Sequence, residues 1–168
     1  SLELNGERSF VFYRNPSADQ LYTPEDVALD VIAPAEIFHY VSIPLIDEPC
    51  RSATLKAVQY ALDSGLLVSY DVNLRLMLWP DEAMARQVVL DTLKYAHVLK
   101  LSDEEVEFLT GGKEVAPLWR DATQLIVVTH GELGATAYTR DGKVIKQPGN
   151  RVKAVDTTGA GDGFMAAL

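Results

Sequence analysis

The apolar positions of the chain follow two patterns. Unbroken or alternating apolar runs are typical of strands, and apolar residues at every third or fourth position are typical of helices. Because the two kinds of segment alternate, we expect an α/β fold with a mainly parallel sheet flanked by helices. The pattern predicts strands at 8–14, 37–43, 66–72, 97–101 and 125–129, helices at 52–64, 81–96, 102–109 and 114–122, and a hairpin of 135–139 and 143–147 around Asp141-Gly142.

A glycine-containing segment lies between a short strand expected at 152–155 and a helix expected at 163–168. It reads Asp156-Thr157-Thr158-Gly159-Ala160-Gly161-Asp162. A turn that leads into a helix directs unpaired backbone N–H groups and the positive end of the helix dipole towards one point, which suits a phosphate. Gly159 and Gly161 let the backbone approach an anion closely, and Asp162 is placed to accept a proton from an attacking hydroxyl group. The segment therefore has the outline of a phosphoryl-transfer site, and the alternative is a turn before a core helix.

Composition narrows the classes of function. The chain has 168 residues, of which 48% are hydrophobic, and a formal net charge of −9. This charge argues against nucleic acid as a partner but not against ATP, which binds through local donors and Mg²⁺. Cys50 is the single cysteine and no apolar run is long enough to span a membrane, so we expect a cytoplasmic protein without a membrane partner. A Walker-type phosphate loop is absent from the sequence.

The run 156–162 resembles the C-terminal signature of the ribokinase-like (PfkB) carbohydrate kinases at every position. The resemblance implies that Asp162 is the general base of a phosphoryl transfer. It also implies that Asp156 and the carbonyl group of Thr158 hold a monovalent cation such as K⁺. The transferred phosphoryl group would be bound by the backbone N–H groups of Gly159, Ala160, Gly161 and Asp162.

The predicted strand 66–72 leads into Asp71-Val72-Asn73-Leu74-Arg75, and Leu78-Trp79 follows shortly after. An Asn and an Arg at the carboxyl end of a strand can bind a hydroxylated substrate or a phosphate oxygen. The alternative is that Asp71 and Arg75 pair with each other or cap the loop. The segment is similar to the Asp-x-Asn-x-Arg…Leu-Trp segment of fructokinase-like PfkB members, which implies that Asn73 and Arg75 line the sugar and phosphate side of the cleft.

The segment Ser102-Asp103-Glu104-Glu105 has two interpretations. In the first it is a capping box, in which the Glu105 side chain reaches back to the N–H group of Ser102. In the second, it corresponds to the family's Asn-x-x-Glu motif, which implies that Glu105 acts on Mg²⁺ through water. Ser102 then stands on the nucleotide side where the family most often has Asn, and its shorter side chain reaches less far.

The predicted strand 125–129 continues into Thr129-His130-Gly131-Glu132-Leu133-Gly134. Two glycines after a strand can open space for a ligand, and an ordinary tight turn is the alternative. The segment resembles the family's Val-Thr-x-Gly-x-x-Gly segment, which implies that Thr129, Gly131 and Gly134 border the nucleotide. We expect His39, His97 and His130 to be structural or surface residues, because none has neighbours spaced like a metal site.

The residues 10–19 form the segment most typical of one subfamily. They resemble the Phe-x-Phe-x-Arg-x-Pro-x-Ala-Asp run of the fructokinase β lid. The resemblance implies that Arg14 points at the sugar cleft, that 1–25 belong partly to a lid, and that a homodimer forms through this lid. The alternative is a plain amphipathic strand.

The resemblance covers the whole chain, so we interpret 1–168 as the central and late part of one ribokinase-like kinase domain. It implies an ATP-dependent sugar kinase that phosphorylates a primary hydroxyl group, with fructose as the first candidate substrate and Mg²⁺ and K⁺ as cofactors. A kinase for ribose, ketodeoxygluconate or a nucleoside is the nearest alternative, and a non-catalytic kinase-like scaffold protein is the alternative of another class. Both ends fall inside expected elements, so we expect further segments on both sides and no activity from these residues alone.

Overall fold

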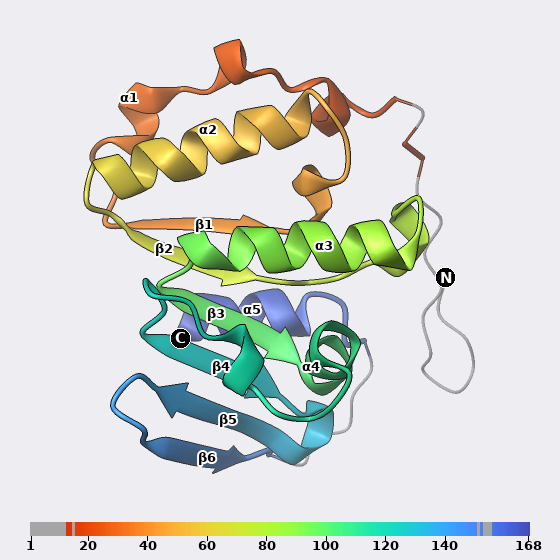
Figure 1. Cartoon of the computed structure of the whole chain (residues 1–168), viewed down its shortest axis with the longest axis vertical. Coiled ribbons are helices and arrows are strands. Elements are labelled where there is room, and N and C mark those ends of the chain that lie inside the picture. Colours follow the sequence, from red (N-terminus) through yellow and green to blue (C-terminus); the bar gives the residue numbers. More distant parts are fainter. Residues whose placement is uncertain (1–12, 15, 151, 153–155) are drawn as a thin grey trace.

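The computed structural model of the chain describes residues 13–14, 16–150, 152 and 156–168 (Figure 1). The strands of this part form one sheet in the order β1-β2-β3-β4-β5-β6. Strands β1 to β4 pair in parallel, and β5 and β6 continue the sheet in antiparallel pairing. The predicted α/β fold is therefore confirmed. The strand bounds are β1 (Ile37–Val41), β2 (Leu67–Asp71), β3 (Val98–Ser102), β4 (Leu125–Thr129), β5 (Gly134–Thr139) and β6 (Val144–Pro148).

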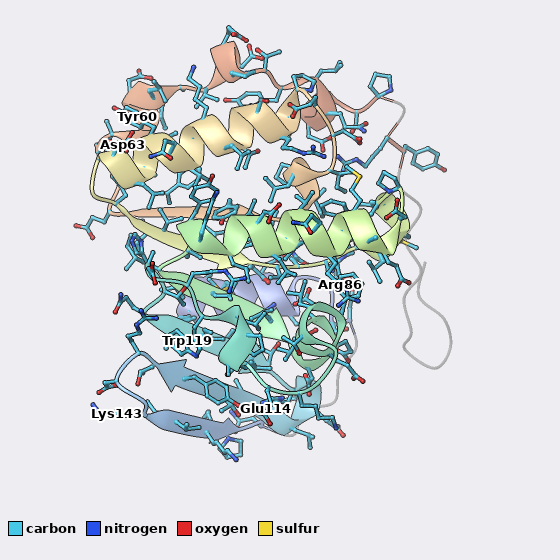
Figure 2. All side chains as sticks on the ribbon, in the orientation of Figure 1. Tyr60, Asp63, Arg86, Glu114, Trp119 and Lys143 are labelled. Atoms are coloured by element: carbon cyan, nitrogen blue, oxygen red, sulfur yellow. The ribbon has the colours of Figure 1, made fainter. Side chains whose placement is uncertain are left out.

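Helices connect the parallel strands and cover the sheet. Helix α2 (Cys50–Asp63) follows β1, α3 (Glu82–Thr92) follows β2, and α4 (Asp103–Thr110) follows β3. Arg86 of α3 lies 4.5 Å from the ring centre of Phe108 and so joins α3 to α4 (Figure 2). Helix α5 (Ala160–Ala167) lies behind β3 in the view of Figure 1, and α3 lies in front of the sheet. The shorter elements are α1 (Leu29–Ile32) and the 3-10 turns η1 (Ala18–Leu21), η2 (Pro24–Asp26), η3 (Ile43–Leu45), η4 (Leu76–Leu78), η5 (Leu93–Tyr95), η6 (Ala116–Leu118) and η7 (Gly131–Leu133).

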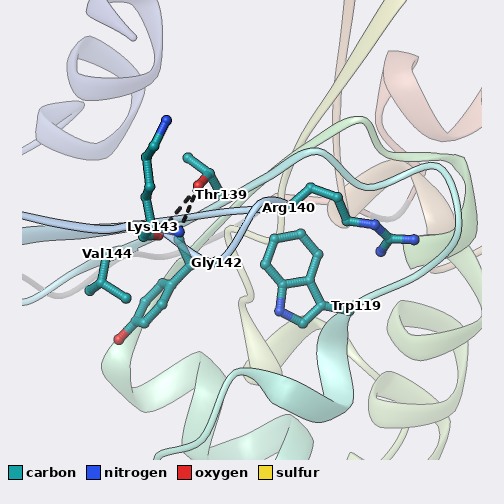
Figure 3. Close-up of a pocket in the computed structure, with 7 residues that line it drawn as sticks. Trp119, Thr139, Arg140, Gly142, Lys143 and Val144 are labelled. Atoms are coloured by element: carbon teal, nitrogen blue, oxygen red, sulfur yellow. Dashed lines mark hydrogen bonds between the residues drawn. The ribbon is translucent and has the colours of Figure 1, made fainter.

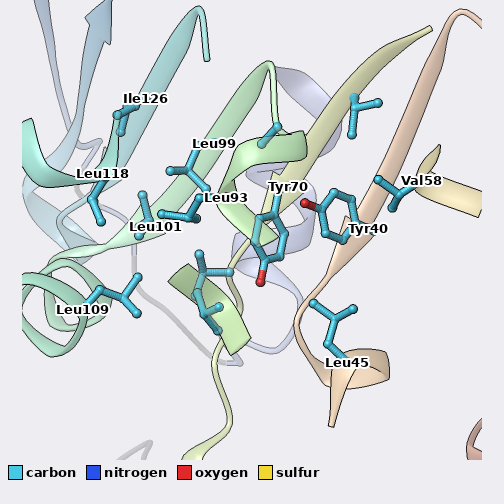
Figure 4. Close-up of a cluster of buried hydrophobic side chains, with 14 of the residues drawn as sticks. Tyr40, Leu45, Val58, Tyr70, Leu93, Leu99, Leu101, Leu109, Leu118 and Ile126 are labelled. Atoms are coloured by element: carbon cyan, nitrogen blue, oxygen red, sulfur yellow. The ribbon is translucent and has the colours of Figure 1, made fainter. Parts of the chain in front are cut away.

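The main apolar core lies on one face of the parallel strands (Figure 4). Tyr70 of β2 and both Leu99 and Leu101 of β3 are fully buried there. The rings of Tyr40 and Tyr70 stack with their centres 4.2 Å apart, and the Tyr40 hydroxyl donates to the Thr92 carbonyl at 2.9 Å. Because side chains alternate along a strand, the residues between these core positions face the other side of the sheet, where α5 lies.

The observed elements differ from the predicted ones in one helix and in several boundaries. The helix predicted at 114–122 is wrong: only the turn η6 forms there, and the chain leaves it at Trp119 in an extended conformation. The last helix begins at Ala160 rather than at residue 163, so the end of the glycine-containing segment belongs to its first turn. The strands predicted at 8–14 and 152–155 lie mostly outside the described residues. The other predicted strands, helices and the hairpin are confirmed, with ends that shift by about four residues at most.

Candidate active site

The carboxyl ends of β2, β3 and β4 lie side by side at one edge of the sheet. The strand register pairs Asp71 with Lys100 and Ser102 with Thr129. Three of the predicted site segments follow these ends: the loop after β2, the start of α4 and the loop after β4. Ligands of parallel α/β sheets bind outside the carboxyl ends of the strands. The structure thus places these segments where such a ligand would lie.

The segment 156–159 turns the chain into α5. The Oδ1 atom of Asp156 accepts hydrogen bonds from the N–H and hydroxyl groups of Thr158, at 2.8 and 2.7 Å. Gly159 caps the helix in the left-handed region, with a φ of 74° that residues with a side chain rarely adopt. The two residues proposed from the resemblance to hold a monovalent cation are therefore in direct contact with each other.

The first turn of α5 presents unpaired amides. The N–H group of Ala160 donates to the Thr157 carbonyl at 3.1 Å. In the part of the chain that the structure describes, the N–H groups of Gly159, Gly161 and Asp162 have no such acceptor. Of the four predicted amides, these three, at the positive end of the helix dipole, are therefore the ones available to an anion.

Asp162 is exposed and lies beside the loop that follows β2. The Asn73 side chain donates from Nδ2 to Asp162 Oδ1 at 3.4 Å. Asn73 itself has a φ of 41°, in the left-handed region that few residues other than glycine occupy. Such conformations persist where surrounding contacts hold them, and they are frequent at ligand sites. The predicted base and the predicted sugar-binding amide, 89 residues apart in the sequence, thus lie together.

Asp71, the last residue of β2, binds both this loop and a lysine of the neighbouring strand. Its Oδ1 atom accepts the N–H group of Asn73 at 3.1 Å, and both of its carboxylate oxygens accept from Lys100 Nζ at 3.0 Å. Burial raises the pKa of Asp71, and the Lys100 ammonium opposes this rise. Of the alternative roles considered for Asp71, pairing with Arg75 does not occur, whereas capping of the loop does. Arg75 instead donates from Nη1 to the Leu74 carbonyl at 3.0 Å.

Glu105 uses both carboxylate oxygens for backbone contacts. Its Oε2 atom accepts the N–H group of Ser102 at 2.7 Å, and Ser102 Oγ accepts the N–H group of Glu105 at 3.3 Å, which confirms the capping box. Its Oε1 atom accepts the N–H group of Leu74 at 2.6 Å. Glu105 therefore joins the start of α4 to the loop that carries Asn73. Burial raises the pKa of Glu105, and the two backbone hydrogen bonds lower it.

A metal ion in this site would have few ligands from the chain itself. Among the described residues, no cluster of three or more His, Cys, Asp or Glu side chains is placed to hold one. Mg²⁺ ordinarily keeps several waters and binds one or two carboxylates together with substrate phosphates. The oxygens of Glu105 each keep a further lone pair beside their backbone donors. The residues present therefore fit an ion that binds mainly to phosphates and water.

The residues after β4 have separate structural explanations. Thr129 donates from Oγ1 to the Leu101 carbonyl at 3.3 Å. Gly131, with a φ of 57°, borders open space, because a Cβ atom there would meet no atom within 4 Å. Gly134, with a φ of 106°, lies so close to β6 that a Cβ atom would be 2.0 Å from the Gln147 carbonyl oxygen. The close approach of two strands explains Gly134, and Gly131 is the glycine that leaves room for a ligand.

The histidines have structural contacts, as expected. His130 lies 2.9 Å from both Asp103 Oδ2 and Thr136 Oγ1, and so joins the start of α4 to β5. His39 Nδ1 lies 2.8 Å from the Ser69 hydroxyl. His97 Nδ1 accepts the backbone N–H group of Val68 at 2.9 Å, which extends the pairing of β2 with β3.

Arg14 pairs with an acid of the segment that follows it. Its guanidinium forms an ion pair with Asp19 at 2.7 Å, and its side chain is 16% exposed. Its charge also acts on Cys50, the first residue of α2, and no hydrogen bond or ion pair among the described residues joins it to Asn73, Arg75 or Asp162. Most of the lid segment to which Arg14 was assigned lies outside the described residues.

Comparison with known proteins identifies the family of the chain. The family model described as pfkB family carbohydrate kinase matches residues 2–168. The chain belongs to this family. It is 51% identical to Fructokinase-2 of Oryza sativa subsp. japonica, covering 100% of this chain and 51% of that protein. It is 50% identical to Probable fructokinase-4 of Arabidopsis thaliana, covering 53% of that protein. The chain thus spans about half the length of the curated relatives it matches.

Solved structures of pfkB-type kinases share the fold. The fructokinase of Xylella fastidiosa with bound ATP superposes with a TM-score of 0.87 at 35% identity, over 98% of this chain and 52% of that one. The fructokinase of Vibrio cholerae O395 in its fructose-, ADP- and calcium-bound form gives a TM-score of 0.82 at 34% identity, over 98% and 54%. In the part of this pfkB chain that is described, none of the helices has the length and apolar character needed to cross a membrane.

Sequence reasoning missed one residue that the structure places beside the candidate site, Lys100, which pairs with Asp71 and lies against Gly161. Its signal is visible in the sequence, since a lysine interrupts the apolar run of the predicted strand 97–101. A charged residue is rarely buried unless it is paired, so this position called for a partner. The partner, Asp71, lies on a different strand, and the sequence alone does not show which strands are neighbours.

A second concave region lies away from the site, at the turn between β5 and β6 (Figure 3). Trp119, Arg140 and Lys143 are among its lining residues. This turn lies beside the amino end of β4, because Thr139 pairs with Leu125. The region is therefore at the opposite end of the strands from Asp162 and is not part of the candidate site.

Proposed function

We propose that the full-length protein carrying this chain is an ATP-dependent fructokinase, which transfers the γ-phosphoryl group of ATP to a primary hydroxyl group of fructose. The observation that carries the proposal is the contact of Asp162 with Asn73 at 3.4 Å, beside the unpaired amides of the first turn of α5. A proton acceptor, a sugar-binding amide and an anion-binding turn then share one site. The identity to plant fructokinases along the whole chain supports fructose as the sugar.

In this reaction Asp162 accepts the proton of the sugar hydroxyl group as its oxygen attacks the γ-phosphorus, and ADP leaves. The amides of Gly159, Gly161 and Asp162 stabilise the negative charge on the transferred group, together with the dipole of α5. Asn73 holds the sugar next to the base, with Arg75 and Arg14 as further substrate-binding residues. The fructokinase of Xylella fastidiosa binds ATP, and we assign Ser102, Thr129, Gly131 and Gly134 to the nucleotide side of the same cleft.

Two cations complete the proposal. Mg²⁺, when bound with the nucleotide, neutralises charge on the phosphates, and Glu105 contacts it through water. Asp156 and the carbonyl group of Thr158 bind a monovalent cation such as K⁺ next to the anion hole. Chelation by EDTA is expected to abolish turnover, and replacement of K⁺ by a larger organic cation is expected to reduce it.

The wider organisation is also a proposal. Residues 1–168 form the central and late part of one kinase domain, in which 1–25 contribute to a lid. A homodimer forms through this lid, which size-exclusion chromatography with light scattering would test. We place the enzyme in the cytoplasm, because the single cysteine, Cys50, is free and buried, as is usual in a reducing compartment.

The test is a coupled assay of ADP release by the full-length protein with fructose, ribose, ketodeoxygluconate and adenosine as acceptors. We expect fructose to give the highest kcat/KM and Asp162→Asn to lower kcat by roughly 10²–10⁴-fold. Glu104→Gln is the matched control, since Glu104 is an exposed acid in the first turn of α4. A loss below tenfold in Asp162→Asn would contradict the assignment of the base. ATP binding without turnover of any sugar would favour the scaffold alternative.

A further inference from the structure

The proposed reaction leaves one buried ion pair without a role. The side chains of Lys100 and Asp71 are 7% and 1% exposed, and they lie on neighbouring strands on the face of the sheet opposite the apolar core. A buried ion pair adds little stability, because the loss of hydration of both charges offsets their attraction. A pair of apolar side chains would fill the same space at no greater cost. Stability alone therefore does not account for the pair.

The ammonium group of Lys100 faces the first turn of α5. A Cβ atom at position 161 would lie 3.2 Å from Lys100 Nζ, so the absence of a side chain at Gly161 lets the helix settle directly on this group. Two of the three N–H donors of the ammonium go to Asp71. No other described residue accepts its third donor. A buried positive charge is thus fixed against the turn that carries the anion-binding amides.

We propose that Lys100 is a positioning residue of the phosphoryl-transfer site: oriented by Asp71, its ammonium group seats the first turn of α5 and adds a fixed positive charge behind the anion hole. This inference rests on the proposed function. A fixed charge in a site from which water is excluded acts more strongly on charge that develops during the reaction than it does in water. The effect therefore falls mainly on the chemical step.

Asp71 connects the two walls of the site. The same carboxylate that orients Lys100 also accepts the N–H group of Asn73 at 3.1 Å, and Asn73 reaches Asp162 at 3.4 Å. The loop that holds the sugar and the turn that holds the phosphoryl group therefore share one buried support. This support explains why an ionised pair, rather than an apolar one, occupies the ends of β2 and β3.

The experiment compares wild type, Asp71→Asn and the double variant Asp71→Asn/Lys100→Met in the full-length protein. The double variant removes both charges and leaves none unpaired, so we expect it to be more stable than Asp71→Asn, which strands a buried lysine. If the ammonium group acts on the reaction, kcat should be lower in the variant that lacks the lysine, even though that variant is the more stable of the two. We expect kcat to fall about 10²–10³-fold in the double variant and less in Asp71→Asn, with the Kd for ATP changed by less than about threefold in the double variant.

Thermal unfolding and the slow hydrolysis of ATP without sugar are measured on the same samples. A kcat of the double variant within about threefold of wild type would overturn the proposal. An order of activity that simply follows the order of Tm, or failure of the double variant to fold, would also overturn it, because the pair would then be structural. If wild type does not phosphorylate fructose, the proposed function fails by itself. The rate of ATP hydrolysis in the two variants still tests Lys100.

Discussion

The two faces of β3 differ completely in chemistry, although their residues alternate along five positions of one strand. Leu99 and Leu101 are fully buried in the apolar core, whereas Lys100 between them is buried against Asp71 and α5. The period of two residues in a strand separates these roles without any change in backbone. One face contributes to the free energy of folding, and the other would position charge for the proposed reaction.

Leu99 and Lys100 are both buried, but for different physical reasons. Leu99 is buried because the removal of apolar surface from water is favourable, and its environment tolerates only a similar shape. Lys100 is buried although its charge is thereby stripped of water, and it persists because Asp71 compensates for the lost hydration. Substitutions on the two faces should therefore separate stability from activity.

The largest effect on stability is expected from Leu99→Ala. Leu99 is fully buried, so the variant leaves a cavity in the core. We expect the free energy of unfolding to fall by about 2–5 kcal/mol. The kcat of the protein that remains folded should stay within about twofold of wild type, because the apolar face does not touch the site. Urea denaturation with activity measured on the folded fraction checks both. A large loss of kcat at constant stability would break the separation of the two faces.

The apolar pattern was sufficient to predict the sheet, most helices and the hairpin, because a buried face leaves a periodic signal in the sequence. The helix expected at 114–122 did not form, because the apolar spacing there does not show that the chain becomes extended at Trp119. A different signal singled out the segment containing Asp162: its glycines and acids indicate a particular chemistry even without knowledge of the fold. The pairing of Asp71 with Lys100 was not predictable, because it depends on which strands lie next to each other.

A smaller effect on stability is expected from Glu105→Gln, in the first turn of α4. Glu105→Gln keeps the shape of the side chain but places an amide NH₂ group against one of the two backbone N–H groups that the carboxylate now accepts. We expect a loss of about 1–3 kcal/mol in the free energy of unfolding. The KM for fructose should rise, because the N–H group of Leu74 anchors the loop that carries Asn73.

Ser102→Ala is the control for Glu105→Gln, because it removes the hydroxyl of the same capping box and leaves the contact with Leu74 intact. Its loss of stability is expected to be about 1 kcal/mol, as for other helix caps. The KM for fructose should stay unchanged. An equal rise of this KM in both variants would show that the helix start, and not the loop contact, determines sugar binding. A shift in the Mg²⁺ dependence of Glu105→Gln alone would support the metal role instead.

Gly134 and Thr129 were both predicted to border the nucleotide, and the structure gives each of them a contact within the protein. The approach of β6 already explains Gly134. The hydroxyl of Thr129 donates to the Leu101 carbonyl. A motif records that a residue type recurs at a position, and it does not separate a packing reason from a ligand contact.

The smallest expected effect separates these two reasons for Thr129. Thr129→Val removes the hydroxyl with little change of shape, and we expect a loss of about 1 kcal/mol in the free energy of unfolding. Thr123→Val is the matched control, since the buried Thr123 hydroxyl donates to the Ala96 carbonyl at 3.1 Å, just before the amino end of β4. Both variants lose a similar bond, but only Thr129 lies at the edge that would hold ATP. A rise of the KM for ATP in Thr129→Val alone would assign the hydroxyl to the nucleotide. Equal KM values in the two variants would leave it a structural contact and confine the nucleotide side of this loop to Gly131, where the backbone borders open space.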